Sequence, residues 1–214
     1  MDDVIIIKNV SKKFKNTEVL SNINISFESG KIHGLIGRNG SGKTVLMKCI
    51  CGLIPTTTGT ITVNNKVIRQ DIEIPKNIGI IIETPGFLPD YSAYKNLLFL
   101  SKIQSKIGKT EIRTAIKNVG LNPDDKKHVG KYSLGMRQRL GLAQAIMENP
   151  DILILDEPMN GLDKDGVADM RKYLLNLKEQ GKTIIIASHS AEDIEILCDT
   201  VSEMEKGILT RLKS

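Results

Sequence analysis

Residues 37–44 carry the strongest chemical signal in this sequence, Gly-Arg-Asn-Gly-Ser-Gly-Lys-Thr, which matches the phosphate-binding pattern G-x-x-x-x-G-K-[ST]. The glycines permit a turn that side chains would obstruct, so that successive backbone N–H groups can face an anion. Lys43 adds a cation for the outer phosphates, and Thr44 adds a hydroxyl for Mg²⁺, which prefers oxygen ligands. The residues predicted to bind the phosphates of a nucleoside triphosphate are Gly37, Arg38, Asn39, Gly40, Ser41, Gly42, Lys43, Thr44 and Val45.

Two adjacent carboxylates, Asp156 and Glu157, follow an apolar run at residues 152–155. A buried strand would carry them to its C-terminal edge, where open parallel sheets bind ligands. Asp156 can hold Mg²⁺ through water there, and Glu157 can orient or deprotonate an attacking water, which is worth about 10²–10⁴-fold in rate. A plain strand end is the alternative. His189 closes another apolar run, at residues 183–188, where it could hydrogen-bond a terminal phosphate or be merely structural.

The elements expected around these residues alternate between strand and helix. Residues 31–36 are predicted as a strand and residues 45–50 as the first turns of a helix, which would place the loop at the positive end of a helix dipole. Such an alternation continues after Pro150 and indicates a parallel sheet with crossover helices. The segments expected there are strands at residues 151–156 and 183–188 and helices at residues 164–180 and 191–198.

The remaining chain divides into a strand-rich start and a helical middle. Strands are expected at residues 4–10 and 20–27, followed by a hairpin at residues 59–68 that turns at Asn64-Asn65. Residues 78–82 form a continuous apolar run, which predicts a strand buried on both faces. Between residues 93 and 147 the apolar period becomes helical, so a helical segment is inserted into an α/β core.

Composition limits the class of protein. The chain has 214 residues, 40% hydrophobic and 26% charged, as in ordinary globular domains, and its apolar runs fall well short of the roughly 20 residues of a membrane span. The start Met-Asp-Asp-Val lacks a signal-peptide pattern, so a soluble, cytoplasmic protein is expected. The formal charge of +5 fits a solvated surface or a membrane surface better than nucleic acid, because basic and aromatic residues are not interleaved. Cys49, Cys51 and Cys198 are predicted to be reduced and mostly buried.

Residues 132–143, Tyr-Ser-Leu-Gly-Met-Arg-Gln-Arg-Leu-Gly-Leu-Ala, resemble the signature motif of ATP-binding cassette (ABC) ATPases. The resemblance covers essentially the whole chain. The other segments that are similar to family motifs are residues 10–14 (adenine-stacking loop), 160–163 (D-loop) and 187–189 (switch histidine). The resemblance implies that Phe14 stacks on adenine, although an ordinary core aromatic is the alternative for this side chain.

The resemblance implies a single ABC ATPase domain over residues 1–214. Its fold class is α/β: a RecA-like P-loop NTPase core with a mostly parallel sheet, an N-terminal antiparallel β subdomain and an inserted α-helical subdomain. Residues 1–84 and 151–214 would form the core with the β subdomain, and residues 85–150 the helical subdomain.

In the family, two ATP molecules are sandwiched between two cassettes arranged head to tail. The resemblance therefore implies that Ser133, Gly135 and Met136 contact the nucleotide of a second chain, taken as an identical one, and that Asp163 lies along the dimer seam. A plain helix N-cap is a compatible role for Ser133. The implied cofactors are ATP and Mg²⁺, with Thr44, Glu83 and Asp156 as metal ligands and Glu157 and His189 as catalytic residues.

Two positions depart from the usual family pattern. The signature is commonly Leu-Ser-Gly-Gly-Gln, so that Ser133 and Gly135 are kept here while Leu134 and Met136 replace Gly and Gln. The family also usually has Gln where this chain has Glu83, which cannot donate a hydrogen bond when ionised and adds negative charge. With these departures the sequence is similar to the bacitracin- and lantibiotic-type export ATPases.

The resemblance implies a subunit on the inner face of the cell membrane that binds and hydrolyses ATP and powers a separate membrane permease, exporting peptide antibiotics or other drugs. Phe87, Leu88, Tyr91 and Tyr94 either line a groove for a coupling helix of the permease or pack as an ordinary loop. One alternative is a soluble ABC-type ATPase that acts on the ribosome or DNA, although neither a long coiled coil nor a second cassette fits this chain. A P-loop kinase is the other, and Ser133 and His189 argue against it. No nucleic-acid partner is expected.

Overall fold

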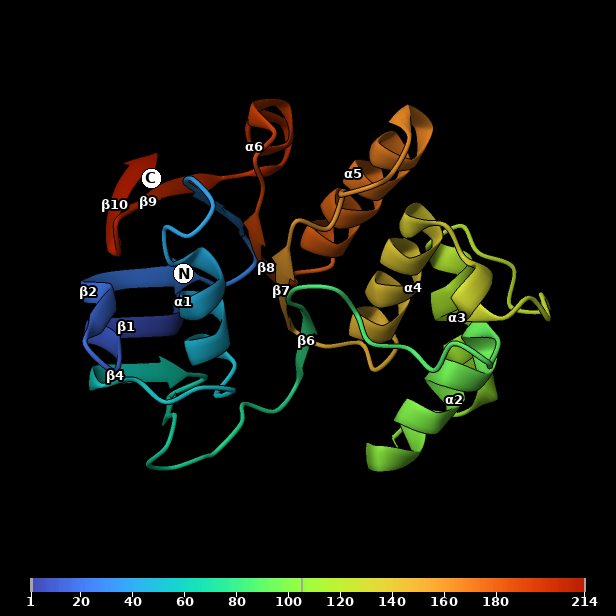
Figure 1. The fold of residues 1–214 in the computed structure, drawn as a ribbon, viewed down its shortest axis with the longest axis horizontal. Helices are drawn as coiled ribbons and strands as arrows, with labels where there is room; N and C mark the ends of the chain where they lie inside the picture. Colours follow the sequence, from blue (N-terminus) through green and yellow to red (C-terminus); the bar gives the residue numbers. More distant parts are fainter. Residues whose placement is uncertain (1, 105, 214) are drawn as a thin grey trace.

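Two β-sheets build the part of the protein that contains both chain ends (Figure 1). The computed structural model describes residues 2–104 and 106–213, with Gln104 described by its backbone alone. The smaller sheet is antiparallel, in the order β2-β1-β4-β5, with β1 at Asp3–Phe14, β2 at Thr17–Glu28, β4 at Thr58–Val63 and β5 at Lys66–Val67. The larger sheet has the order β10-β9-β3-β8-β7-β6, with β3 at Ile32–Ile36, β6 at Ile78–Ile81, β7 at Ile152–Asp156, β8 at Thr183–Ala187, β9 at Thr200–Glu205 and β10 at Ile208–Lys213. All its pairings are parallel except that of β10 with β9.

Helices lie on both faces of the larger sheet. α2, α3 and α4 gather at the end of the molecule away from the chain termini, whereas α1 lies beside the antiparallel sheet (Figure 1). The α-helices of the described residues are α1 at Lys43–Ile50, α2 at Ala93–Gln104, α3 at Lys109–Asn118, α4 at Leu134–Ile146, α5 at Lys164–Glu179 and α6 at Ala191–Leu197. No helix in the described ranges is long and apolar enough to cross a membrane.

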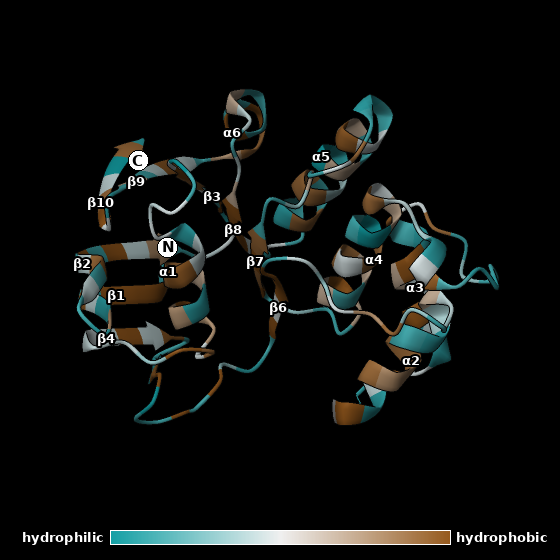
Figure 2. Ribbon diagram, in the orientation of Figure 1, coloured by the Kyte–Doolittle hydropathy of each residue, from teal (hydrophilic) through white to brown (hydrophobic). Residues whose placement is uncertain are grey.

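The larger sheet separates two hydrophobic cores because its central strands are apolar on both faces. In β7, Leu153 and Leu155 pack with the helices α2 to α5, while Ile152 and Ile154 pack with α1 and the antiparallel sheet. Figure 2 shows β6, β7 and β8 coloured hydrophobic along their lengths. The central strands β7 and β8 are thus covered on both faces, by helices on one face and by α1 with the antiparallel sheet on the other. The carboxyl ends of β3, β7 and β8 thereby meet at one edge.

The predicted fold class is confirmed, and most predicted segments match observed elements. The hairpin at residues 59–68 turns at Asn64 and Asn65, whose φ angles of 49° and 61° suit the tight turn of a two-residue hairpin. All three cysteines are free and buried, as predicted.

Two expectations about strands differ from the structure. The run at residues 78–82 was expected to be buried on both faces, but β6 is the edge strand of its sheet, and Ile78 and Ile80 are only partly buried. The hairpin of β9 and β10 has no counterpart among the predicted segments. Its signal is the turn Lys206-Gly207, whose φ angles of 45° and 81° again suit a two-residue hairpin.

Candidate functional site

The loop at residues 37–44 connects β3 to α1, and the backbone requires glycine at its start. Gly37 has a φ of 140°, and a Cβ there would lie 2.2 Å from the carbonyl oxygen of Met204. Gly42, with a φ of 117°, is the N-cap of α1. The loop therefore ends at the N-terminus of α1, where free backbone N–H groups and the helix dipole favour an anion.

Two side chains of this loop are arranged for an anion. Lys43 is buried, and its Nζ donates to the carbonyl oxygens of Gly37 at 2.7 Å and Arg38 at 3.2 Å. Ser41 Oγ is also buried, yet it has no hydrogen-bond partner among the described residues. A buried hydroxyl without a partner is costly, and a phosphate oxygen in the loop would supply one. The residues present therefore fit a phosphate chain.

Thr44 and Asp156 form the second part of the site. Thr44 Oγ1 donates to Asp156 Oδ2 at 2.7 Å, although the two residues are 112 positions apart in the sequence. A hydroxyl and a carboxylate are the ligands that Mg²⁺ accepts when phosphates and water complete its shell. No cluster of three or more histidine, cysteine, aspartate or glutamate side chains among the described residues could hold a metal without such help.

Glu157 stands at the end of β7 in a strained backbone conformation. Its φ is 51°, unusual for a residue with a Cβ, and its N–H donates to the carbonyl oxygen of Ala187 at 3.0 Å. Gln138 of α4 donates to the carbonyl oxygen of Glu157 at 3.0 Å. Burial raises the pKa of the Glu157 carboxyl, and the nearby charge of Asp156 adds to this, while His189 acts in the opposite direction. Strain and a raised pKa are both typical of a functional acid or base.

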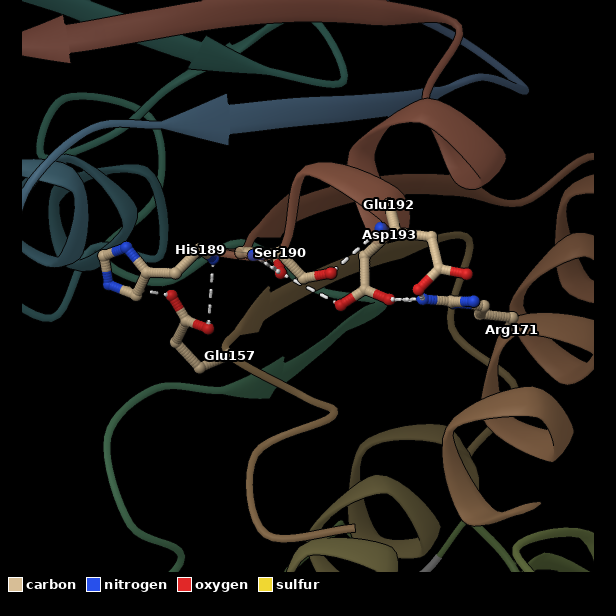
Figure 3. Close-up of polar contacts among 7 residues, drawn as sticks. Glu157, Arg171, His189, Ser190, Glu192 and Asp193 are labelled. Atoms are coloured by element: carbon tan, nitrogen blue, oxygen red, sulfur yellow. Dashed lines mark hydrogen bonds and ion pairs between the residues drawn. The ribbon is translucent and has the colours of Figure 1, made fainter. Parts of the chain in front are cut away.

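His189 lies between the carboxylate and the loop. Its Nε2 is 2.8 Å from Asn39 Oδ1 in the loop. The same Nε2 is 3.2 Å from Glu157 Oε1, and the His189 backbone N–H donates to Glu157 Oε2 at 3.4 Å (Figure 3). Glu157 Oε1 is buried and makes no well-oriented hydrogen bond despite this approach. His189 therefore links the carboxylate of Glu157 to the phosphate-binding loop.

One cleft joins these groups. Most of the residues predicted to bind phosphate or metal, or to act in catalysis, contribute to its walls. The cleft is lined by Val19, Asn39, Gly40, Ser41, Gly42, Lys43, Thr44, Val45, Glu83, Thr84, Pro85, Leu134, Arg137, Gln138, Asp156, Glu157, Asn160 and His189. Gln138 and Asn160 were not predicted as site residues, although both lie in segments that resemble family motifs, residues 132–143 and 160–163.

Glu83 borders this cleft, but its carboxylate is paired elsewhere. Glu83 Oε1 lies 2.6 Å from Lys48 Nζ, and the side chain is 64% exposed. Lys48 was not predicted as a site residue. It lies on α1 four residues after Thr44, and this spacing, which puts both side chains on one face of the helix, could have indicated its position. The predicted contact of Glu83 with a metal stays a prediction.

Phe14 lies outside the lining of the cleft, at the end of β1. Its side chain is 45% exposed, so it is not an ordinary core aromatic. Lys12 Nζ lies 4.8 Å from the centre of the ring, a cation–π contact. An exposed ring can stack on a flat base, and the predicted contact with adenine stays a prediction.

The signature-like segment begins α4, and three of its residues, Leu134, Arg137 and Gln138, line the cleft, whereas Ser133, Gly135 and Met136 do not. Ser133 Oγ accepts a hydrogen bond from the Met136 N–H at 3.2 Å, which confirms the N-cap role. A Cβ on Gly135 would lie 2.7 Å from the carbonyl oxygen of Gly161, so only glycine fits there. Asp163 is likewise the N-cap of α5, through the Gly166 N–H at 2.9 Å.

Comparison with known sequences identifies the relatives of this chain. The family model described as ABC transporter matches residues 20–160. The chain is 50% identical to the uncharacterized ABC transporter ATP-binding protein YybJ of Bacillus subtilis, with 94% of this chain and 92% of that protein covered. It is 42% identical to the bacitracin transport ATP-binding protein BcrA of Enterococcus faecalis, with 98% of this chain and 68% of that protein covered. It is 37% identical to the lantibiotic transport ATP-binding protein SrtF of Streptococcus pyogenes, with 94% of this chain and 86% of that protein covered.

Comparison with solved structures agrees on the fold. A dimeric ATP-binding cassette in a post-hydrolysis state, bound to ADP and Pi, superposes with a TM-score of 0.87 at 20% identity. The match covers 98% of this chain and 99% of the other.

Proposed function

Because this chain belongs to the ABC transporter family as an ATP-binding subunit, we propose that it hydrolyses ATP in the cleft described above and thereby drives a separate membrane permease. By similarity to the bacitracin and lantibiotic transport proteins, the cargo is a peptide antibiotic or a related drug, exported from the cell. The subunit would then lie on the cytoplasmic face of the membrane.

One observation carries the proposal of hydrolysis. A buried carboxylate oxygen of Glu157 without a well-oriented partner shares one cleft with the phosphate loop and with the Thr44–Asp156 pair. A cleft that only bound nucleotide would have no need of a carboxylate with a buried oxygen and a raised pKa, because the desolvation of that oxygen is costly.

The chain's own residues divide the work of binding. Lys43 and the N–H groups of the loop hold the phosphates, and the Ser41 hydroxyl gains the partner that it lacks. Thr44 and Asp156 would hold Mg²⁺, and their existing hydrogen bond already fixes the spacing of the two oxygens. The metal would offset the negative charge that develops on the phosphate oxygens.

Glu157 and His189 would act on the attacking water and the terminal phosphate. Glu157 accepts the proton of the water, since its raised pKa makes it a stronger base than an exposed carboxylate. His189, which lies next to Glu157 and in contact with Asn39, would donate a hydrogen bond to the terminal phosphate.

The site requires a second copy of the chain to be complete. Ser133, Gly135 and Met136 do not line the cleft of their own chain, and Asp163 is exposed. We propose that these residues meet the nucleotide bound by another cassette, in a head-to-tail dimer that closes on ATP.

The permease would contact the loop between β6 and α2. Leu88 is 50% exposed and Tyr91 39% exposed, and Tyr91 stacks edge to face on Phe99, with ring centres 5.2 Å apart. Phe87 and Tyr94, by contrast, pack against the core. Asn96 fixes this loop through hydrogen bonds to both the N–H and the carbonyl of Leu88. The exposed pair is thus presented on a rigid segment.

A pull-down from membranes tests the transport proposal. Tagged protein expressed in its source cells and captured after detergent extraction should retain a protein with many membrane spans, identified by mass spectrometry. Tyr91→Ala should reduce that recovery severalfold, because it removes a central apolar contact. Ile208→Ala is the control, since Ile208 is equally apolar, 57% exposed and on β10. Recovery of ribosomal proteins or DNA instead would overturn the proposal.

The Lys48–Glu83 pair yields a prediction about ATP affinity. Lys48→Gln should weaken binding of Mg·ATP about fivefold, because it leaves the Glu83 carboxylate uncompensated beside the phosphates. Glu83→Gln in the same protein should restore the affinity. Equilibrium binding of a fluorescent ATP analogue measures both, and losses that simply add in the double variant would contradict the prediction.

A further inference from the structure

The two residues that flank His189 are both hydrogen-bonded to Asp193 of α6, Ser188 to its side chain and Ser190 to its backbone N–H. Ser188 Oγ donates to Asp193 Oδ2 at 3.1 Å, and the Asp193 N–H donates to Ser190 Oγ at 3.2 Å. The Ser190 N–H also donates to Ser188 Oγ at 3.1 Å, which closes the turn around His189. Figure 3 shows Asp193 directed at this turn from the side opposite Glu157.

Asp193 is itself held by an arginine from another helix. It is only 3% exposed, and its Oδ1 accepts two hydrogen bonds from Arg171 of α5, from Nε at 2.8 Å and from Nη2 at 2.6 Å. A buried carboxylate is stable only when it is paired and hydrogen-bonded, and a two-pronged contact with arginine fixes its orientation. Arg171 also reaches Glu192 at 3.0 Å, but that carboxylate is 70% exposed.

His189 depends on this support because little else restrains it. Its side chain is 47% exposed, and among the described residues its polar contacts are with Asn39 and Glu157. Both contacts lie on the side where a nucleotide would bind, so binding would alter them. The backbone on either side of His189 is then the remaining constraint on where the imidazole lies.

We propose that Asp193, oriented by Arg171, is a positioning residue for His189, acting through the hydroxyl of Ser188. The inference rests on the proposed hydrolytic function. It assigns a role in turnover to a contact between α5 and α6 that otherwise would only brace two helices. A displacement of about 1 Å at a catalytic group can cost up to a hundredfold in rate, so a small shift of the turn matters.

Removal of the Ser188 hydroxyl separates positioning from bracing. Ser188→Ala leaves the Arg171–Asp193 ion pair in place but cuts its link to the turn. We expect kcat for ATP hydrolysis to fall at least tenfold, with the dissociation constant for ATP close to that of the wild type. The Tm should fall by a few degrees, because Asp193 Oδ2 and the Ser190 N–H each lose a hydrogen-bond partner. Ser188→Thr keeps a hydroxyl and should retain kcat within about threefold. Asp193→Asn should lower kcat as Ser188→Ala does, with an additional loss of Tm.

Glu192→Gln is the matched control, because it changes the other carboxylate on the same arginine without touching the turn. It should leave kcat unchanged. Wild-type kcat in Ser188→Ala, or an equal loss of kcat in Ser188→Thr and Ser188→Ala, would overturn the positioning role. Failure of the wild-type protein to hydrolyse ATP would instead overturn the proposed function, so the two failures are distinguishable.

Discussion

Replacing Glu157 with glutamine is expected to lower kcat for ATP hydrolysis by about 10²–10⁴-fold while ATP binding is kept. Glutamine has the same size, and its carbonyl oxygen can still accept the 3.4 Å hydrogen bond from the His189 N–H. The amide cannot take a proton from the attacking water, so only the base is lost. Steady-state ATPase assays with equilibrium nucleotide binding measure the two effects separately.

The same variant should accumulate as a dimer when Mg·ATP is present. If ATP closes two cassettes and hydrolysis opens them, a variant that binds but does not hydrolyse remains closed. Size-exclusion chromatography should show the dimer with Mg·ATP and the monomer without it. Adding Lys43→Ala to Glu157→Gln is the control, because it removes the phosphate contact and should abolish the dimer. A monomer at saturating ATP would contradict the sandwich arrangement.

The raised pKa of Glu157 also predicts the sign of a stability effect. Burial raises the pKa of this carboxyl in the folded protein above its value in the unfolded chain. The stability that the protonated carboxyl contributes is therefore fully present below the unfolded pKa. It is lost as the pH rises through the folded pKa. At neutral pH the ionised group therefore disfavours folding. Glu157→Gln should have a Tm equal to or above that of the wild type at pH 7, as is expected when a residue is kept for function.

The residues of the site were predictable wherever chemistry dictates a short local pattern. The loop at residues 37–44 and the Asp156-Glu157 pair each follow an apolar strand. Parallel strands deliver their carboxyl ends to one edge, so the meeting of Thr44 with Asp156 follows from the alternation of strand and helix. The role of Ser133 as a helix N-cap was predictable for the same reason, because its hydroxyl bonds a backbone N–H only three residues along the chain.

Contacts between distant surface residues were not predictable. Lys48 and Glu83 are 35 positions apart, and Arg171 and Asp193 are 22 apart on different helices. Which lysine or arginine meets which carboxylate depends on helix rotation and loop path, and neither is encoded in a local pattern. The edge position of β6 was missed similarly, because an apolar run indicates burial but does not reveal on how many sides a strand has neighbours.

Replacing Lys43 with alanine is expected to weaken ATP binding by about a hundredfold. Lys43 is 6% exposed, and its ammonium already lies over the loop, bonded to the carbonyl oxygens of Gly37 and Arg38. Exchange of these contacts for phosphate oxygens requires only a small movement, so the cation is pre-positioned. Isothermal titration with ATP measures the loss.

Lys182→Ala is the matched control for Lys43→Ala. Lys182 is comparably buried, at 8% exposed, and donates to a backbone carbonyl oxygen, that of Asn149 at 3.2 Å, but it lies outside the nucleotide cleft. Both variants should lose stability, because each removes a buried hydrogen-bonded amine, whereas only Lys43→Ala should lose ATP. Equal affinities in the two variants would show that the loop at residues 37–44 does not hold the phosphates, since a buried lysine would then matter only for folding.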